Sequence, residues 1–149
     1  MREDAIILLL EHNDDDVGII ERGLKHSGVN NTVLRFCDAS EMLSFIEGTG
    51  DGVGISPKKS YILLMDIDSP NGDAGEILSK IKSSSGLKMI PVIVFGSADE
   101  ASSIEQWHSR GCSIYLVKPQ DSGEYGETVS KVGSFLSAVE LPRVSKSVD

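Results

Sequence analysis

The chain has 149 residues, which is enough for one domain with a substantial core and leaves no room for a second folded domain. Its formal net charge is −9, and this excess of acidic residues argues against binding nucleic acid through the phosphate backbone. The longest apolar run, residues 5–10, is too short to cross a bilayer, and no secretory signal is visible around it. We therefore expect a cytoplasmic protein that does not associate with membranes.

Five short apolar runs alternate with segments of helical periodicity along the chain. This alternation predicts an α/β fold in which helices flank a parallel sheet. Each intervening segment is long enough for a right-handed crossover between parallel strands. The expected strands are residues 5–10, 32–37, 61–65, 91–95 and 113–117.

Five helices are expected between and after these strands. The first starts near the acidic residues 14–16, whose charge suits the positive end of the helix dipole, and ends at Gly28. The others start near Ser40, near the plausible N-cap Asp73, near Ala98 and near Asp121. The side chains expected to face the core are Val17, Ile20 and Leu24; Met42, Leu43 and Ile46; Ile77, Leu78 and Ile81; Ile104 and Trp107; and Val129, Val132, Phe135 and Leu136.

Two segments fall outside this pattern. Residues 48–60 contain four glycines and a proline and are expected to form a long surface loop. Helical periodicity ends at Pro142, so we predict one domain over residues 1–140 and a short polar tail over residues 141–149. Cys37 and Cys112 lie in apolar stretches without CxxC spacing, so we expect two buried thiols rather than a disulfide or a metal pair.

The most informative stretch begins at Tyr61, where an apolar run ends in Asp66. Parallel strands present their last residues to the crevice in which open α/β folds bind ligands. An aspartate there can be a solvated strand cap, a metal ligand or a phosphate-accepting nucleophile. Glu11 follows the first run and Lys118 follows the fifth, and adjacent strands would bring both to the same edge. A cation held by carboxylates, together with an ammonium, can neutralise phosphoryl oxygens, so this combination suits phosphoryl chemistry.

Taken in order, five signals resemble the receiver domain of bacterial response regulators, and the resemblance covers residues 6–139. They are the first strand with its acidic end, the Asp66 segment with Pro70 and Asp73, the strand Ile-Pro-Val-Ile-Val-Phe at 90–95, the approach at 111–115, and the pair Lys118-Pro119. The resemblance implies a flavodoxin-like, doubly wound, five-stranded parallel sheet of order 2-1-3-4-5 with five helices.

The resemblance also implies a role for each matching position. Asp66 would accept the phosphoryl group, Lys118 would bind a phosphoryl oxygen, and Tyr115 would be the aromatic residue that reorients on activation. Glu11, Asp66 and the backbone carbonyl of Asp68 would surround a Mg²⁺ ion. The phosphoryl donor would be a histidine kinase, and the Tyr-Leu-Val-Lys-Pro ending is similar to that of receivers serving phytochrome-type kinases.

Two positions depart from the receiver pattern. His12 replaces a second acidic residue that ligates magnesium, and we expect weak binding because imidazole is a poor ligand for Mg²⁺. His12 could instead be a ligand for another metal, a general base, or a polar residue in a site that has lost its function. One of the acidic residues 14–16, or Asp68, could replace the missing carboxylate. Gly96 stands where the pattern has a Thr or Ser hydroxyl, and Ser97 would substitute for it only if the loop turns.

These observations leave three functions open. The first is a single-domain response regulator of a two-component phosphorelay, not an enzyme, which accepts phosphate on Asp66 and signals through protein contacts. The second is a receiver-like interaction module that works without phosphorylation. The third and most remote is a haloacid-dehalogenase-like phosphatase, because Asp66-Ile67-Asp68 resembles the Asp-x-Asp motif of that family.

The receiver resemblance also predicts an interaction face. It would be built from the fourth helix, the fifth strand and the fifth helix, and it would contain Trp107, His108, Tyr115 and Tyr125. We therefore expect a downstream protein target and a homodimer as partners, in addition to the kinase.

Overall fold

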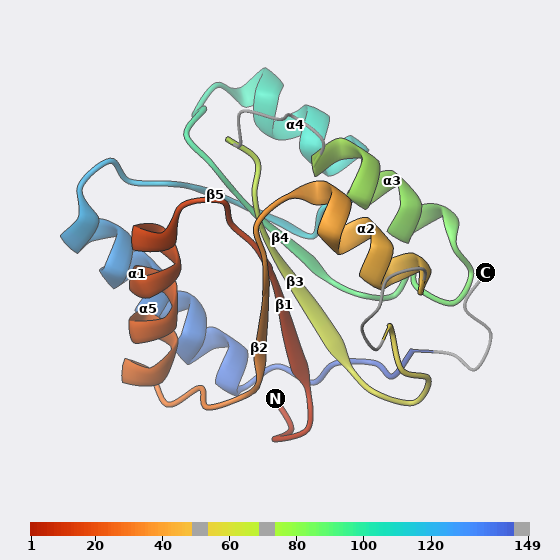
Figure 1. Ribbon diagram of the computed structural model, residues 1–149. Coiled ribbons are helices and arrows are strands. Elements are labelled where there is room, and N and C mark those ends of the chain that lie inside the picture. Colours follow the sequence, from red (N-terminus) through yellow and green to blue (C-terminus); the bar gives the residue numbers. More distant parts are fainter. Residues whose placement is uncertain (49–53, 69–73, 145–149) are drawn as a thin grey trace.

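A parallel β-sheet forms the centre of the molecule. The computed structural model describes residues 1–48, 54–68 and 74–144, and within it five strands pair in the order β2-β1-β3-β4-β5. They are β1 (Ile6–Leu10), β2 (Val33–Phe36), β3 (Tyr61–Asp66), β4 (Val92–Gly96) and β5 (Ile114–Val117). The doubly wound topology predicted from the sequence is confirmed, and β3 lies in the middle of the sheet (Figure 1).

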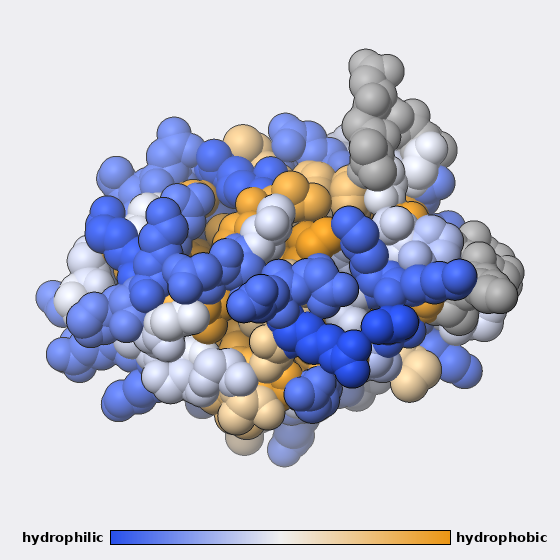
Figure 2. Space-filling model, turned by 90° about the horizontal axis from the view of Figure 1, so that it is seen from below, coloured by the Kyte–Doolittle hydropathy of each residue, from blue (hydrophilic) through white to orange (hydrophobic). Residues whose placement is uncertain are grey.

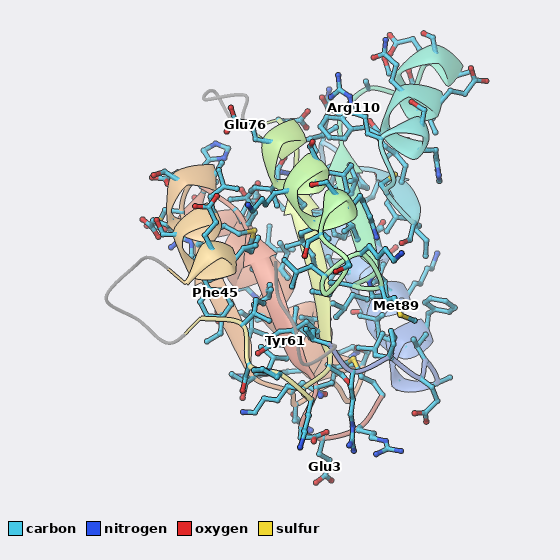
Figure 3. The ribbon with its side chains drawn as sticks, turned by 90° about the vertical axis from the view of Figure 1, so that its right-hand side faces the viewer. Glu3, Phe45, Tyr61, Glu76, Met89 and Arg110 are labelled. Atoms are coloured by element: carbon cyan, nitrogen blue, oxygen red, sulfur yellow. The ribbon has the colours of Figure 1, made fainter. Side chains whose placement is uncertain are left out.

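Helices cover both faces of this sheet. They are α1 (Asp14–His26), α2 (Ala39–Glu47), α3 (Ala74–Ser83), α4 (Ala101–Ser109) and α5 (Ser122–Ser137). α1 and α5 pack against each other on one face, while α2 and α3 lie on the other (Figure 1). Trp107 of α4 packs against the same hydrophobic cluster as α2 and α3. Figure 3 shows this second layer in front of the sheet, with Glu76 at its upper end and Glu3 below the sheet.

In the three central strands, β1, β3 and β4, successive buried residues lie on opposite faces of the sheet. In β1, Leu8 contributes to the core beneath α2 and α3, whereas Ile7 and Leu9 contribute to the core beneath α1 and α5. β3 does the same with Leu63 and Leu64. Because both faces are covered, strands of this kind are continuous apolar runs in the sequence, which is why their positions could be predicted.

Three helices, α1, α2 and α5, begin after residues whose side chains cap them. Asn13 caps α1 by accepting a hydrogen bond from the Asp16 amide at 3.0 Å. Asp121 caps α5 in the same way, accepting from the Glu124 amide at 2.9 Å. These bonds satisfy amides that a helix leaves unpaired at its start. The predicted cap Asp73 lies outside the described residues.

Strand direction separates the molecule into two ends. The carboxyl ends of the strands lie at the top of Figure 1, away from the N-terminus. The opposite end, seen from below in Figure 2, is a mixed surface where hydrophobic residues emerge between hydrophilic ones. There Ser60 pairs with Arg143 in an antiparallel bridge, and the Val144 amide donates to the Lys59 carbonyl at 2.8 Å. Residues 141–144, placed in the tail by the sequence, therefore run beside residues 58–60.

The prediction that Phe135 faces the core is wrong, since 55% of its surface is exposed. Val132 and Leu136 take the buried positions on α5. Phe135 instead lies at the open side of the helix, where it lines a shallow apolar groove with Ile114 and Leu116 of the edge strand. Helical periodicity identified the apolar face of α5, but it could not show which residues of that face the sheet leaves uncovered.

Two further predictions need correction. Cys37 is exposed although Cys112 is buried, because β2 is an edge strand that ends at Phe36 and leaves Cys37 in the turn before α2. The fourth helix begins at Ala101, three residues later than expected, and it has no fully buried side chain. Within the described residues, no helix is both long and apolar enough to span a membrane.

Candidate functional site

Asp66 is the last residue of β3 and lies between the ends of β1 and β4. Its side chain is only 2% exposed. One carboxylate oxygen, Oδ1, accepts a hydrogen bond from the Asp68 amide at 2.8 Å. The strand therefore holds the carboxylate in a fixed orientation at the carboxyl edge of the sheet, as predicted.

Lys118 provides the positive charge beside this carboxylate. Its backbone amide donates to the Gly96 carbonyl at 2.8 Å, which extends the pairing of β4 and β5 by one residue. Its Nζ lies 2.8 Å from Asp66 Oδ2, 2.7 Å from Asp16 Oδ2 and 3.6 Å from Glu11 Oε1. Burial alone would lower the pKa of Lys118, but the hydrogen bonds to Asp16 and Asp66 raise it. The ammonium is thus a permanent cation shared among three carboxylates.

Glu11 follows β1 directly and is completely buried. Its Oε2 accepts a hydrogen bond from the Asn13 amide at 3.2 Å, whereas its Oε1 has no donor within hydrogen-bonding distance among the described residues. Burial and the neighbouring Asp66 carboxylate raise the pKa of Glu11 to about 8. Around neutral pH the side chain is therefore mostly a neutral carboxyl that can donate to Asp66.

The ionisation of Asp66 is opposite to that of Glu11. Burial by itself would raise the pKa of Asp66, but hydrogen bonds from Glu11, Lys118 and the Asp68 amide lower it. Two adjacent carboxyl groups with opposing pKa shifts share one proton and one negative charge. Asp66 keeps that charge, which is the state that a nucleophile needs.

His12 lies next to these carboxylates. Its Nδ1 is 3.4 Å from Glu11 Oε2, and its side chain is 38% exposed. Donor atoms of Glu11, His12 and Asp66 all lie within 4.8 Å of one another, so this group could hold a metal ion. Mg²⁺ requires oxygen ligands in octahedral geometry, and a set in which one of three donors is imidazole nitrogen does not fit it.

The Asp68 side chain is engaged elsewhere, because its Oδ2 accepts a hydrogen bond from the Ser97 amide at 2.8 Å. This bond links the loop after β3 to the loop after β4. The ligand role expected for the Asp68 backbone carbonyl stays a prediction.

Gly96 ends β4, and its missing side chain makes room for Tyr115. A β-carbon at position 96 would collide with the Tyr115 hydroxyl and with Cδ1 of Ile67. The Tyr115 hydroxyl instead occupies this space and donates to the Ala98 carbonyl at 2.8 Å. Tyr115 therefore points into the molecule, in the place that a side chain at position 96 would need.

A hollow of about 280 Å³ opens beside Lys118, and neither Glu11 nor Asp66 lines it. Ser97 and Lys118 line it, together with Tyr125 and with Asp16, one of the three acidic residues that could replace the missing carboxylate. Tyr125 was expected on an exposed interaction face, but it is only 2% exposed, and Lys118 Nζ lies 5.2 Å from its ring centroid. The buried face of α5 repeats every three to four residues, and Tyr125 lies one turn before Val129 on that face, a signal that could have identified it.

Comparison with known proteins shows which proteins this chain is similar to. No protein-family model matches the chain. The response regulator Rcp1 of Synechocystis sp. is 28% identical over 138 residues, which cover 92% of each chain. A response regulator receiver domain from Rhodospirillum rubrum superposes with a TM-score of 0.86 at 22% identity, covering 94% of this chain and 99% of the other. The chain is similar to response-regulator receiver domains over most of its length.

Two further solved structures are similar to this chain. The phosphorylated cyanobacterial phytochrome response regulator RcpA is 26% identical with a TM-score of 0.78, and the match covers 92% of this chain and 97% of that one. The manganese-bound form of Rcp1 is 25% identical with a TM-score of 0.81, covering 92% and 98% of the two chains. The receiver resemblance and fold inferred from the sequence are therefore confirmed.

Proposed function

We propose that this receiver domain accepts a phosphoryl group on Asp66 from the phosphohistidine of a histidine kinase and passes the signal on through protein contacts. The observation that supports this most strongly is the 2.8 Å contact between Lys118 Nζ and Asp66 Oδ2 at the carboxyl end of the central strand. A buried, ionised aspartate with a permanent cation beside it matches the needs of phosphoryl transfer.

The transfer follows from these two groups. A carboxylate oxygen of Asp66 attacks phosphorus, the P–N bond to the donor imidazole breaks, and the leaving nitrogen keeps the bonding electron pair. The product is an acyl phosphate on Asp66. Lys118 then pairs with the new phosphoryl oxygens instead of the carboxylate, which offsets the charge that arrives with the group.

Asp16 sets a condition on this reaction. Its carboxylate holds the other side of the Lys118 ammonium at 2.7 Å, and Asp66 itself is almost inaccessible while that pair is closed. The incoming phosphoryl group therefore has to compete with Asp16 for Lys118. This competition favours a donor docked by its own protein over a small molecule in solution.

The comparisons support the class of donor. RcpA is a phytochrome response regulator, and the bacteriophytochrome response regulator RtBRR also matches over 97% of this chain. We infer a histidine kinase of the phytochrome type as the donor, a downstream protein as the target, and a homodimer as the assembly, all in the cytoplasm. Because the relatives are response regulators, signalling is better supported than the phosphatase activity considered from the sequence.

Acetyl phosphate tests the proposal without knowledge of the kinase. The wild-type chain is expected to gain the mass of one phosphoryl group, while Asp66→Asn gains none. Lys118→Ala is expected to lose most of the labelling, because the phosphoryl oxygens lose their counter-charge. Labelling of Asp66→Asn equal to that of the wild type would exclude Asp66 as the acceptor.

One observation favours the second function, a receiver-like module that works without phosphorylation. Gly96 provides no hydroxyl for a phosphoryl group, and Tyr115 already fills the space beside it. We infer that Tyr115 keeps this inward position whether or not Asp66 carries phosphate. Beryllofluoride with a divalent ion, read by amide NMR, separates the two functions: shifts confined to the residues around Asp66 favour the phosphoacceptor, and no shift favours the module.

A paired variant sharpens this comparison. His12→Asp together with Gly96→Thr supplies the acidic residue and the hydroxyl that the receiver pattern contains. If only this double variant responds to beryllofluoride, the wild-type chain works without phosphate. If the wild type responds as strongly, phosphorylation-independent function is excluded.

A further inference from the structure

We propose that Glu11, His12 and Asp66 bind a divalent transition-metal ion of the Zn²⁺ and Co²⁺ type in preference to Mg²⁺. The inference deepens the proposed function, because it concerns the cation at the same carboxylates, but the binding itself requires no phosphoryl transfer. Its starting point is the mismatch between this donor set and magnesium.

The geometry contains a buried oxygen that accepts no hydrogen bond. Glu11 is completely buried, and its Oε1 has no hydrogen-bond donor among the described residues. Lys118 Nζ is 3.6 Å away and is already bonded to Asp16 and Asp66. A buried polar atom without a partner is costly, and a cation bound to it would remove that cost.

The charges around the cluster also favour a cation. The carboxyl groups of Glu11, Asp16 and Asp66 face a single ammonium, that of Lys118. The remaining neighbour, His12, carries no negative charge. A dication that binds Glu11 would displace its proton, and the three carboxylates would then carry an excess of negative charge that the dication balances. In a buried site this attraction is weakly screened.

His12 determines which cation fits. Imidazole nitrogen is a good ligand for zinc, cobalt, nickel and copper, whereas magnesium prefers six oxygen ligands and gives up its water reluctantly. Zinc sites often combine three protein ligands with a water molecule, and imidazole and carboxylate are both among the ligands that zinc accepts. The same three side chains would leave magnesium with a nitrogen where it needs an oxygen.

The cluster can close around an ion of this size. The donor atoms lie within 4.8 Å of one another, and a tetrahedral zinc site needs them about 3.4 Å apart, given metal–ligand bonds of roughly 2.1 Å. Glu11 and Asp66 are fixed by strand ends, but the His12 side chain is 38% exposed and has room to turn. His12 is therefore the member of the cluster with the most freedom to adjust its position to an ion.

Titration of the purified chain with Zn²⁺, Co²⁺ and Mg²⁺, without any phosphoryl donor, tests the inference. Cys37 is exposed and its thiol could bind zinc independently, so every variant carries Cys37→Ser. Calorimetry is expected to give at least tenfold tighter binding of Zn²⁺ or Co²⁺ than of Mg²⁺. Bound Co²⁺ is expected to show the strong visible absorption bands of a four-coordinate ion.

Substitutions at two histidines provide the decisive comparison. His12→Ala is expected to weaken Zn²⁺ binding at least tenfold, and His12→Asp is expected to reverse the preference in favour of Mg²⁺. His108→Asp is the matched control, because His108 is exposed on α4 and is not one of the cluster residues, and it should leave all three affinities unchanged. Both histidines are exposed, so folding is expected to survive, and circular dichroism checks it.

Either of two results overturns the inference: Mg²⁺ binding as tightly as Zn²⁺ in the wild type, or unchanged Zn²⁺ affinity in His12→Ala. The outcome is independent of phosphorylation. A chain that binds Zn²⁺ through His12 but never gains a phosphoryl group would contradict the proposed function and leave the metal site standing.

Discussion

Lys118 is bound by two carboxylates at the same time. It contacts Asp66 at 2.8 Å and Asp16 at 2.7 Å, so both sides of the ammonium are occupied. Asp16 comes from the first turn of α1, on the other side of the pocket from β5. We therefore expect the reactivity of Asp66 to depend on Asp16, although Asp16 does not itself bind the phosphoryl group in the proposed mechanism.

Replacing Asp16 should increase phosphorylation by small donors. Asp16→Asn removes the anion that competes for Lys118 and repels the phosphoryl group, so labelling by acetyl phosphate is expected to become several-fold faster. The initial rate, measured by intact mass, checks this. Asp15→Asn is the control, because Asp15 is an exposed neighbour in the same helical turn. Equal or slower labelling of Asp16→Asn would show that Asp16 does not restrain Lys118.

Glu11 should make the stability of the fold depend on pH. Its pKa rises from 4.5 to about 8 on folding, so between these values the folded chain holds a proton that the unfolded chain has lost. This contribution to stability is complete below pH 4.5 and is lost as pH rises through about 8. Asp66, whose pKa is lowered, acts in the opposite direction at acidic pH.

Glu11→Gln removes this dependence. The free energy of unfolding of the wild type is expected to fall as pH rises from about 6 to 8, while that of the variant changes less. One pKa unit corresponds to about 1.4 kcal/mol, so the difference is measurable by urea denaturation. Parallel curves for the two proteins would mean that Glu11 is not held as a neutral acid.

At the scale of elements, the close packing of α1 on α5 fixes the position of Tyr125, which lies beside Lys118. Gly23 of α1 faces Val129 of α5, and a β-carbon at position 23 would lie 2.7 Å from Val129 Cγ1. Val129 is buried and cannot move aside easily. One turn earlier on α5, Tyr125 supports Lys118, so the spacing of these helices bears on the pocket.

Two glycines of α1 give a matched test of this packing. Gly23→Ala is expected to lower the free energy of unfolding by about 1–2 kcal/mol, because overpacking outweighs the gain in helix propensity. Gly18→Ala is expected to raise it by up to about 1 kcal/mol, since its added β-carbon meets only the flexible end of Arg22, at 3.2 Å. Chemical denaturation measures both. Stabilisation by both substitutions would show that the α1–α5 contact can accommodate a β-carbon at position 23 without strain.

The elements themselves were largely predictable. All five strands lie within one or two residues of their expected positions, because buried parallel strands are uninterrupted apolar runs. The errors fall where burial depends on the edge of the sheet, as at Cys37 after β2 and Phe135 beside β5. Periodicity gives the apolar side of a segment but not how much of that side another element covers.

For the whole molecule, strand order made it possible to predict which residues at the strand ends lie near one another in the site. Asp66, Glu11 and Lys118 meet because they end neighbouring or nearby strands of one sheet. The contact of Asp16 with Lys118 joins residues 102 positions apart and depends on side-chain reach, which the sequence does not encode locally. Periodicity could have placed Tyr125 on the buried face of α5, but its contact with Lys118 depends on where α5 lies on the sheet.

The central claim is that Asp66 is the residue that receives phosphate, and chemical mapping tests it most directly. The chain is incubated with a small donor containing a P–N bond, such as phosphoramidate, and then treated with borohydride, which reduces an aspartyl phosphate to homoserine. Peptide mass spectrometry then locates the reduced residue. We predict homoserine at position 66 in the wild type and at no position in Asp66→Asn. Homoserine at another aspartate, or at none, would contradict the assignment of Asp66 as the phosphoacceptor.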